Sequence, residues 1–184
     1  MEISNNNYNI LICGEAINTE FCIKIMTEIN EIKKVDEYKI FTNHYNQKQY
    51  KNYKDTYYGY NKDIKDIIEN ITNKQIEDTK NNNAKHILVV FDDIFIDSNL
   101  QNFVLNAKNL NISFIITMRH PSHDRFNSYF DFIFSFLCKN IFMQRYLYRY
   151  YGNIFTNFQS FKECIMKLKK NEYLLTDNKH NKIF

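Results

Sequence analysis

The sequence predicts an α/β fold built on a mostly parallel central sheet of about five strands. Between Tyr8 and Phe136, short apolar runs alternate with segments whose apolar residues recur at helical spacing. One of these runs, HILVVF at 86–91, is apolar and β-branched after its histidine, which is typical of a strand covered on both faces. Such alternation favours a layered domain in which helices cover the sheet.

Each expected element has its own signal. The strands are short apolar runs at 8–13, 38–41, 86–91, 112–118 and 130–136. The helices carry apolar residues three and four positions apart, which places them on one face: Cys22, Ile25, Met26, Ile29 and Ile32; Ile64, Ile67, Ile68 and Ile71; Leu100, Phe103, Val104 and Ala107; and Phe158, Phe161, Ile165 and Leu168. Ser98 can cap the third helix, because a serine hydroxyl accepts from free backbone N–H groups.

We predict a single domain spanning residues 1–184. Two of its segments do not follow the alternation of strands and helices. Residues 43–61 are polar, rich in tyrosine and without a clear period. They predict an irregular insertion, and stacking of its tyrosines on bases is the less favoured alternative. Residues 139–184 are predicted to be a basic helical part, with nine Lys or Arg against three acidic residues. A solvated helical face and a nucleic-acid contact both account for this charge.

Composition places the chain among globular proteins. Its 184 residues are 44% hydrophobic and are enough to bury a full core. No apolar run approaches the roughly 18–20 residues of a membrane span, so we expect no membrane association. The cysteines lie in apolar patterns without C-x-x-C spacing, which predicts buried, reduced thiols in an intracellular protein: Cys13, Cys22, Cys138 and Cys164.

The residues that follow each expected strand are the candidates for function. In a parallel α/β sheet, ligands bind beyond the carboxyl ends of the strands. The first strand is followed by GEAINTEF at 14–21, the third by Asp92 and Asp93, and the fourth by RHPSHDRFN at 119–127. We therefore expect these three segments to meet at one edge of the sheet.

The stretch HILVVFDDIFIDSNLQNFVLNAKNLNISFIITMRH resembles the genome-packaging ATPases of poxviruses and related large DNA viruses. These enzymes are members of the FtsK–HerA branch of P-loop ATPases. Asp92 and Asp93 match the acidic pair of the Walker B motif, and the spacing to Arg119 is kept. Ala107-Lys108-Asn109 stands where Gly-Arg-His is usual, and Arg119 stands where Gln is usual. Arg125 with Phe126-Asn127 resembles the family's Arg-x-Asn.

The resemblance covers nearly all of the chain from Tyr8 to about Phe136. It implies a P-loop NTPase-like, RecA-like three-layer sandwich. In the family, the first acidic residue orients magnesium through water and the second polarises the attacking water. It also implies rings in which one subunit completes its neighbour's site. Arg119 and Arg125 are then candidates for sensor-like or finger-like roles.

Set against the Walker A pattern G-x-x-x-x-G-K-[ST], the first loop is degenerate. Gly14 supplies the first glycine, whereas Thr19 takes the place of the second glycine, Glu20 of the lysine and Phe21 of the magnesium-binding hydroxyl. A Cβ at Thr19 resists the backbone that wraps phosphate. Two unit charges about 4 Å apart interact by roughly 4 kcal/mol at an effective dielectric near 20, so Glu20 opposes phosphate strongly. Phe21 cannot ligate magnesium.

Two cations stand near this degenerate site in the sequence. Lys24 lies one helical turn beyond Glu20 and is expected to pair with Glu20 or Glu28 on the surface. Arg119 either points into the site or pairs with Asp92 or Asp93, filling the space of magnesium and phosphate, and we favour the pairing. The two aspartates are then inherited but catalytically silent, although an Asp-Asp pair can also simply cap the turn after a strand.

No metal site is predicted. His120 and His123 stand three apart on a loop and lack a third convergent ligand, so we interpret them as surface histidines. We also expect no cofactor. ATP with magnesium would be the cofactor only if the divergent loop were active.

Three functions follow from these features. The favoured one is a pseudo-ATPase, a degenerate homologue of the packaging ATPase that serves as a scaffold, assembly or regulatory partner. An active packaging motor, an ATP hydrolase with a divergent phosphate loop, is the first alternative. The second is a DNA-binding module whose basic residues are Arg145, Arg149, Lys162, Lys167, Lys169 and Lys170. Expected partners are other proteins or further copies of the chain, in the host cytoplasm, at a viral factory, or in the virion.

Overall fold

The computed structural model describes residues 7–15, 17, 19–43, 46–58, 63–94, 98–119, 130–152, 154–178, 180 and 182–184. Within them the strands are β1 (Asn9–Cys13), β2 (Glu37–Thr42), β3 (Thr56–Tyr58), β4 (Ile87–Asp92), β5 (Ile112–Met118), β6 (Phe132–Phe136), β7 (Tyr173–Asp177) and β8 (Lys182–Ile183). The α-helices are α1 (Thr19–Ile32), α2 (Asp63–Lys80), α3 (Ser98–Ala107), α4 (Ile141–Tyr151) and α5 (Phe158–Lys167). Two short 3₁₀ helices are η1 (Gln47–Tyr50) and η2 (Lys108–Leu110).

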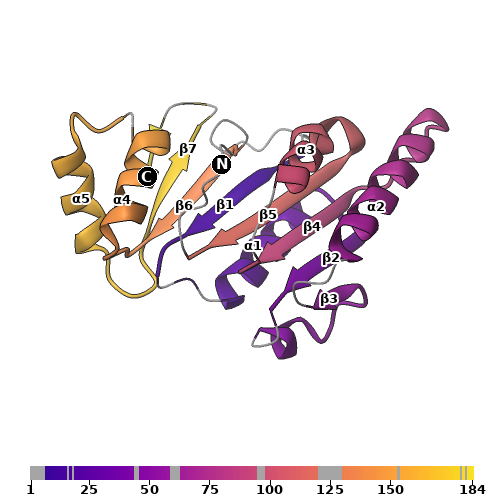
Figure 1. Ribbon diagram of the computed structural model, residues 1–184, viewed down its shortest axis with the longest axis horizontal. Coiled ribbons are helices and arrows are strands. Elements are labelled where there is room, and N and C mark those ends of the chain that lie inside the picture. Colours follow the sequence, from indigo (N-terminus) through magenta and orange to yellow (C-terminus); the bar gives the residue numbers. More distant parts are fainter. Residues whose placement is uncertain are drawn as a thin grey trace.

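The eight described strands form one sheet in the order β3-β2-β4-β5-β1-β6-β7-β8 (Figure 1). The strands from β3 to β6 in this order run parallel, and β7 and β8 are antiparallel to their neighbours. In register, Cys13 pairs with Met118 and Thr42 pairs with Asp92. The carboxyl ends of β1, β2, β4 and β5 therefore lie at one edge, as the sequence predicts.

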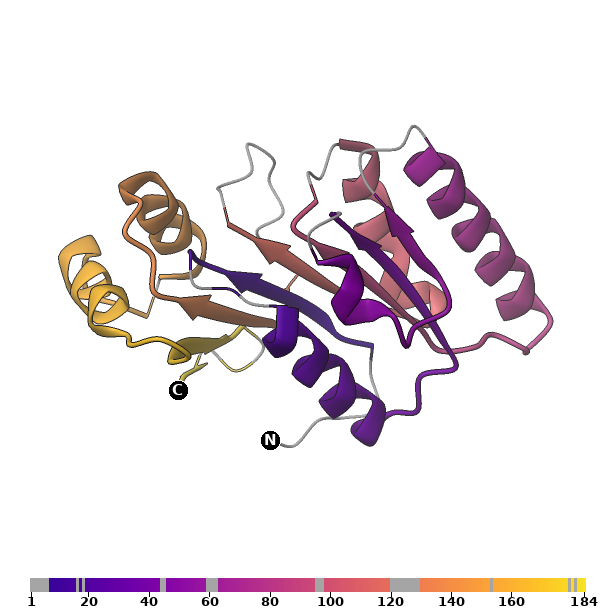
Figure 2. The ribbon, with the colours of Figure 1, turned by 90° about the horizontal axis from the view of Figure 1, so that it is seen from below.

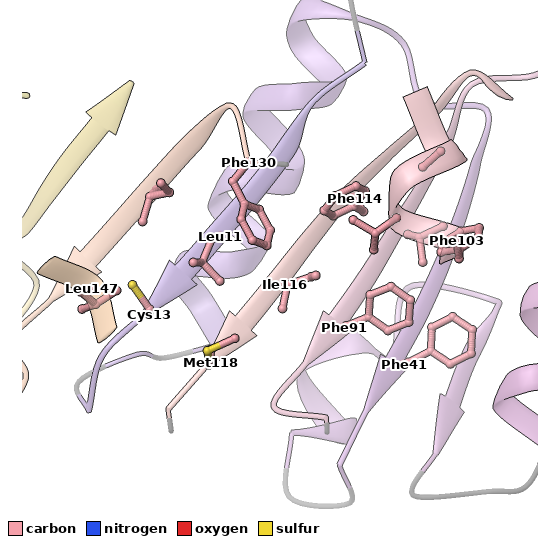
Figure 3. Close-up of a cluster of buried hydrophobic side chains, with 14 of the residues drawn as sticks. Leu11, Cys13, Phe41, Phe91, Phe103, Phe114, Ile116, Met118, Phe130 and Leu147 are labelled. Carbon is pink, nitrogen blue, oxygen red and sulfur yellow. The ribbon is translucent and has the colours of Figure 1, made fainter. Parts of the chain in front are cut away.

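Helices cover both faces of the sheet, so the predicted α/β sandwich is confirmed (Figure 2). Leu11 belongs to the core on one face and Ile12 to the core on the other, because successive side chains of a strand point to opposite faces. The core around Leu11 is covered by α2, α3, α4 and α5, and Figure 3 shows its aromatic residues. There the rings of Phe41 and Phe91 stack with centroids 5.1 Å apart. The core around Ile12 is covered by α1 and η1.

The expected count of about five strands is too low. The structure adds β3, β7 and β8, which have three, five and two residues. Residues 139–184, expected to be helical, contain α4 and α5 but end in β7 and β8. β7 gains its order from pairing with β6, a contact between distant segments that local periodicity does not report.

The segment 43–61 is not irregular throughout, which corrects a second expectation. It contains η1 and β3, and β3 extends the sheet by pairing in parallel with β2. Tyr50, at the end of η1, is fully buried in the core around Ile12. Among the helices that the structure describes, none combines the length and the apolar character needed to cross a membrane.

Candidate functional site

Gly14 makes the turn that leaves β1. Its φ of +129° lies in the region that favours glycine, and a Cβ there would stand 2.9 Å from the carbonyl oxygen of Phe136. Beyond it, the Glu15 carboxylate accepts from the backbone N–H groups of Lys139 and Asn140 at 2.9 and 2.7 Å. The turn is thereby fastened to the connection between β6 and α4.

Thr19 begins α1 and is almost fully buried. Its hydroxyl donates to Asp92 Oδ2 over 3.2 Å. In P-loop ATPases the hydroxyl residue and the Walker B aspartate hold the same magnesium, so the two are neighbours. This contact favours an alignment with the Walker A pattern in which Thr19, two residues before Phe21, takes the hydroxyl position. In that alignment Ile17 and Asn18 stand where the Walker A pattern has the second glycine and the lysine.

Glu20 and Phe21 turn away from Asp92. Glu20 is exposed to solvent. Phe21 packs its ring against those of Phe134, Phe136 and Tyr173, at centroid distances of 5.3, 4.9 and 5.2 Å. Phe21 is therefore a packing residue between α1 and the strands β6 and β7.

The prediction for Lys24 is confirmed in one of its two forms. Its ammonium lies 3.8 Å from the Glu28 carboxylate, and both side chains are exposed. An exposed pair of this kind contributes little to stability.

Asp92, at the end of β4, is buried, with 2% of its surface exposed. Its Oδ1 accepts from the hydroxyl of Thr117 at 2.8 Å. Its Oδ2 accepts from three donors: the hydroxyl of Thr19 at 3.2 Å, Nδ2 of Asn46 at 3.0 Å and the phenol of Tyr50 at 3.1 Å. All four donors are neutral, so hydrogen bonds, and not a cation, stabilise this buried carboxylate.

Asp93 follows in a left-handed conformation, with a φ of +58°. Its backbone N–H donates to the Thr117 hydroxyl at 2.8 Å, and its Oδ2 accepts from Nδ2 of Asn43 at 3.0 Å. Nε of Arg119 lies 3.3 Å from the same oxygen. The favoured prediction, that Arg119 pairs with one of the two aspartates, is confirmed, and the partner is Asp93.

Besides Thr117, three described residues at the site escaped sequence reasoning: Asn43, Asn46 and Tyr50. They come from the end of β2 and from η1, and they reach both aspartates. Burial, with Cys22 and Asp92 close by, raises the pKa of Tyr50, so its phenol stays protonated and can donate.

Among the residues that the structure describes at this edge, the donors and charges fit a magnesium–nucleotide group poorly. Each oxygen of a carboxylate offers about two lone-pair sites, and three described donors already share Asp92 Oδ2, whereas Oδ1 accepts from Thr117. The cation that pairs with Asp93 in the described part of the chain is Arg119. In the described part of the chain, moreover, no group of three or more His, Cys, Asp or Glu residues is arranged to hold a metal ion.

The remaining candidate residues lie elsewhere. Arg125, His120 and His123 fall outside the described residues. The basic candidates lie on α4, on α5 and just after α5, and all are exposed except the half-buried Lys162: Arg145, Arg149, Lys162, Lys167, Lys169 and Lys170. In Figure 1 these helices cover the β6–β7 end of the sheet, whereas β4 lies towards its other end.

The four cysteines are free thiols. Three of them are buried, as expected, whereas Cys164 is half-buried. Burial raises the pKa of Cys13 to about 12 and that of Cys138 to about 11. Neither thiol is therefore poised for nucleophilic chemistry at neutral pH.

Solved structures of viral packaging NTPases share this fold over nearly the whole of both chains. The genome-packaging NTPase B204 of Sulfolobus turreted icosahedral virus 2 with sulfate matches with a TM-score of 0.69 at 13% identity, covering 98% of this chain and 96% of that one. Its complex with ATP-γS matches with a TM-score of 0.65 at 12% identity, over 98% and 97% of the two chains.

The DNA-packaging ATPase B204 of Sulfolobus turreted icosahedral virus matches with a TM-score of 0.67 at 11% identity, over 98% of this chain and 97% of that one. No protein-family model and no curated protein matches the sequence. The fold expected from the resemblance is thus confirmed. The chain has the fold of a viral genome-packaging NTPase, a P-loop ATPase-type α/β sandwich.

Proposed function

We propose that this protein is a packaging-related homologue of the viral packaging ATPases that does not hydrolyse ATP and acts as a scaffold, assembly or regulatory partner. Fold-level similarity over nearly the full length of B204 supports the link to packaging. Its partners are then other packaging proteins or further copies of the chain. Its place is the host cytoplasm, at a viral factory, or the virion.

One observation carries the proposal: the chain's own side chains engage both members of the acidic pair. Asp93 pairs with Arg119, and Asp92 accepts four neutral hydrogen bonds. A phosphate loop needs a lysine to neutralise the β- and γ-phosphates, and neither register supplies one. The missing lysine and the occupied Oδ2 of Asp92, among the residues that the structure describes, support a site that does not bind MgATP.

Isothermal titration with ATP and magnesium tests this proposal. We expect no binding in the micromolar range, whereas B204, which has been solved with ATP-γS, serves as the positive control. Micromolar binding of MgATP by this protein would overturn the proposal.

An active packaging ATPase is the second candidate, and the contact between Thr19 and Asp92 favours it. A hydroxyl next to the Walker B aspartate is one part of a magnesium site. A steady-state phosphate-release assay, with and without DNA, tests this candidate. Release that is stimulated by DNA and abolished by Asp93→Ala would support it, and release unchanged by Asp93→Ala would remove Asp93 from the chemistry.

A DNA-binding module is the third candidate. It rests on the exposed basic side chains of α4 and α5 and of the residues just after α5. Binding through phosphate contacts releases counterions, so the affinity for DNA should fall steeply between low and physiological salt. Retention of the protein on DNA that does not change with salt concentration would count against this candidate.

A further inference from the structure

Three polar side chains from one short stretch reach the two aspartates. Asn43 donates to Asp93 Oδ2, and both Asn46 and Tyr50 donate to Asp92 Oδ2. We call these three side chains the polar plug. Since Thr42 pairs with Asp92 in the sheet, the plug begins directly beside the carboxyl end of β4.

The plug is built into the fold by bonds of its own. The backbone N–H of Asn46 donates to the Asn43 side chain at 3.1 Å, and that of Gln49 donates to the carbonyl of Asn46 at 3.1 Å. The N–H of Tyr53 donates to the carbonyl of Tyr50 at 2.9 Å. The Tyr50 side chain has no exposed surface and belongs to the core around Ile12. Withdrawal of Tyr50 would therefore open that core.

The plug also takes up most of the hydrogen-bonding capacity of Asp92 Oδ2. Of the three donors to this oxygen, two belong to the plug and one is Thr19. Magnesium favours carboxylate and water oxygens, and a metal-bound water would need an acceptor position that Asn46 or Tyr50 now occupies. This obstruction is separate from the degeneracy of the loop after Gly14.

We propose that the polar plug closes the acidic edge of the sheet against divalent cations and thereby makes Asp92 a structural residue that joins β2, η1, α1 and β5 to β4. The proposal goes beyond the absence of hydrolysis, because it names the segment that excludes the metal. It predicts that opening the plug restores metal binding at Asp92 even though the phosphate loop stays degenerate.

The first experiment measures the binding of Mn²⁺ without nucleotide. Binding is followed by the decrease in the electron paramagnetic resonance signal of free Mn²⁺. The variant is Asn46→Ala with Tyr50→Phe, which removes both donors and keeps the ring in the core. The matched control is Tyr53→Phe, which removes a hydroxyl from the same stretch that does not contact Asp92. We expect the double variant to bind Mn²⁺ about tenfold more tightly than the wild type and the control. Adding Asp92→Asn should abolish the gain.

Two results of this experiment would overturn the proposal. One is a double variant that is folded by circular dichroism and gains no Mn²⁺ affinity. The other is a wild-type protein that already binds Mn²⁺ through Asp92 as tightly as the double variant. Titration of the wild type with ATP tests the proposed function separately. A result of the Mn²⁺ experiment that contradicts the plug would therefore leave the proposed absence of ATP binding unaffected.

A second experiment uses the unmodified chain and does not depend on the folding of any variant. Amide hydrogen exchange of Gln49 and Tyr53 should be as slow as that of the central strands, and millimolar magnesium with ATP should leave it unchanged. Fast exchange at these two amides, or exchange that accelerates with magnesium and ATP, would show a mobile cover and contradict a built-in plug.

Discussion

Arg119 and Asp93 form an ion pair across the carboxyl edge of the sheet, with Nε of the arginine 3.3 Å from Oδ2 of the aspartate. Arg119 follows β5 and Asp93 follows β4, so the pair links two neighbouring strands. Asp93 also holds a left-handed backbone, which asparagine and aspartate tolerate better than most residues. A guanidinium thus balances the more exposed of the two aspartates, whereas the buried one relies on neutral donors.

Replacing Arg119 by glutamine, the residue usual in the packaging ATPases, should cost little stability. Both side chains of the pair are partly exposed, so solvent screens the attraction, and we expect a loss of less than about 1 kcal/mol in the free energy of unfolding. Urea unfolding at low and at high salt measures this loss, which should shrink as salt rises. A loss that is large and independent of salt would contradict a screened surface pair.

Replacing Asp92 by alanine should be far more damaging. The change leaves the buried hydroxyls of Thr19, Thr117 and Tyr50 without their acceptor, and each unsatisfied buried group costs about 1–3 kcal/mol. We expect a loss of about 3 kcal/mol or more in urea unfolding. The matched control is Asp93→Ala, which removes a half-buried carboxylate and should cost about 1 kcal/mol. Equal losses for the two variants would refute a structural role specific to Asp92.

Restoring the Walker A residues in the sequence register should not restore nucleotide binding. Phe21→Ser removes a ring that packs on Phe134, Phe136 and Tyr173, so it should destabilise the protein by about 2 kcal/mol. Glu20→Lys, at an exposed position, should leave stability within about 0.5 kcal/mol of the wild type. Thermal unfolding and ATP titration of the two single variants and the double variant check this. MgATP binding by a stable double variant would support the sequence register instead.

A buried histidine should make stability depend on pH. His86 hydrogen-bonds through Nδ1 to the carbonyl of Lys34 at 3.0 Å and through Nε2 to the hydroxyl of Ser113 at 2.9 Å. A carbonyl can only accept, so Nδ1 donates, and the neutral ring accepts from Ser113 at Nε2. Burial lowers the pKa of His86 below its ordinary value of 6.5.

The sign of the effect follows from proton binding. Below pH 6.5 the unfolded chain binds a proton at His86 that the folded protein resists, so stability falls as the pH drops from 6.5 towards the folded pKa. The contribution is at most about 1.4 kcal/mol per pH unit. Urea unfolding at pH 7.5 and 5.5 gives the change in the free energy of unfolding between the two pH values. This change should be smaller for His86→Asn than for the wild type. Equal differences would remove His86 as a source of the pH dependence.

Much of the fold could be predicted from local patterns. Apolar runs at 8–13, 38–41, 86–91, 112–118 and 130–136 all correspond to strands, because a strand covered on both faces is apolar along its length. The strands β3, β7 and β8 escaped prediction. They lie towards the edges of the sheet, where β3 pairs with β2, β7 with β6 and β8 with β7, and local sequence does not encode this pairing.

The amino-acid pattern alone predicted a parallel sheet with Gly14, Asp92, Asp93 and Arg119 just beyond strand ends, and it places Glu20 where the Walker A pattern has lysine. These conclusions depend on residue identity and on strand ends, which are local properties. The three-dimensional packing was needed to show that Thr19 and Tyr50 donate to Asp92 and that Arg119 pairs with Asp93. Such contacts join residues as many as 73 positions apart. These contacts depend on how the elements pack against one another, which no repeating pattern along the chain predicts.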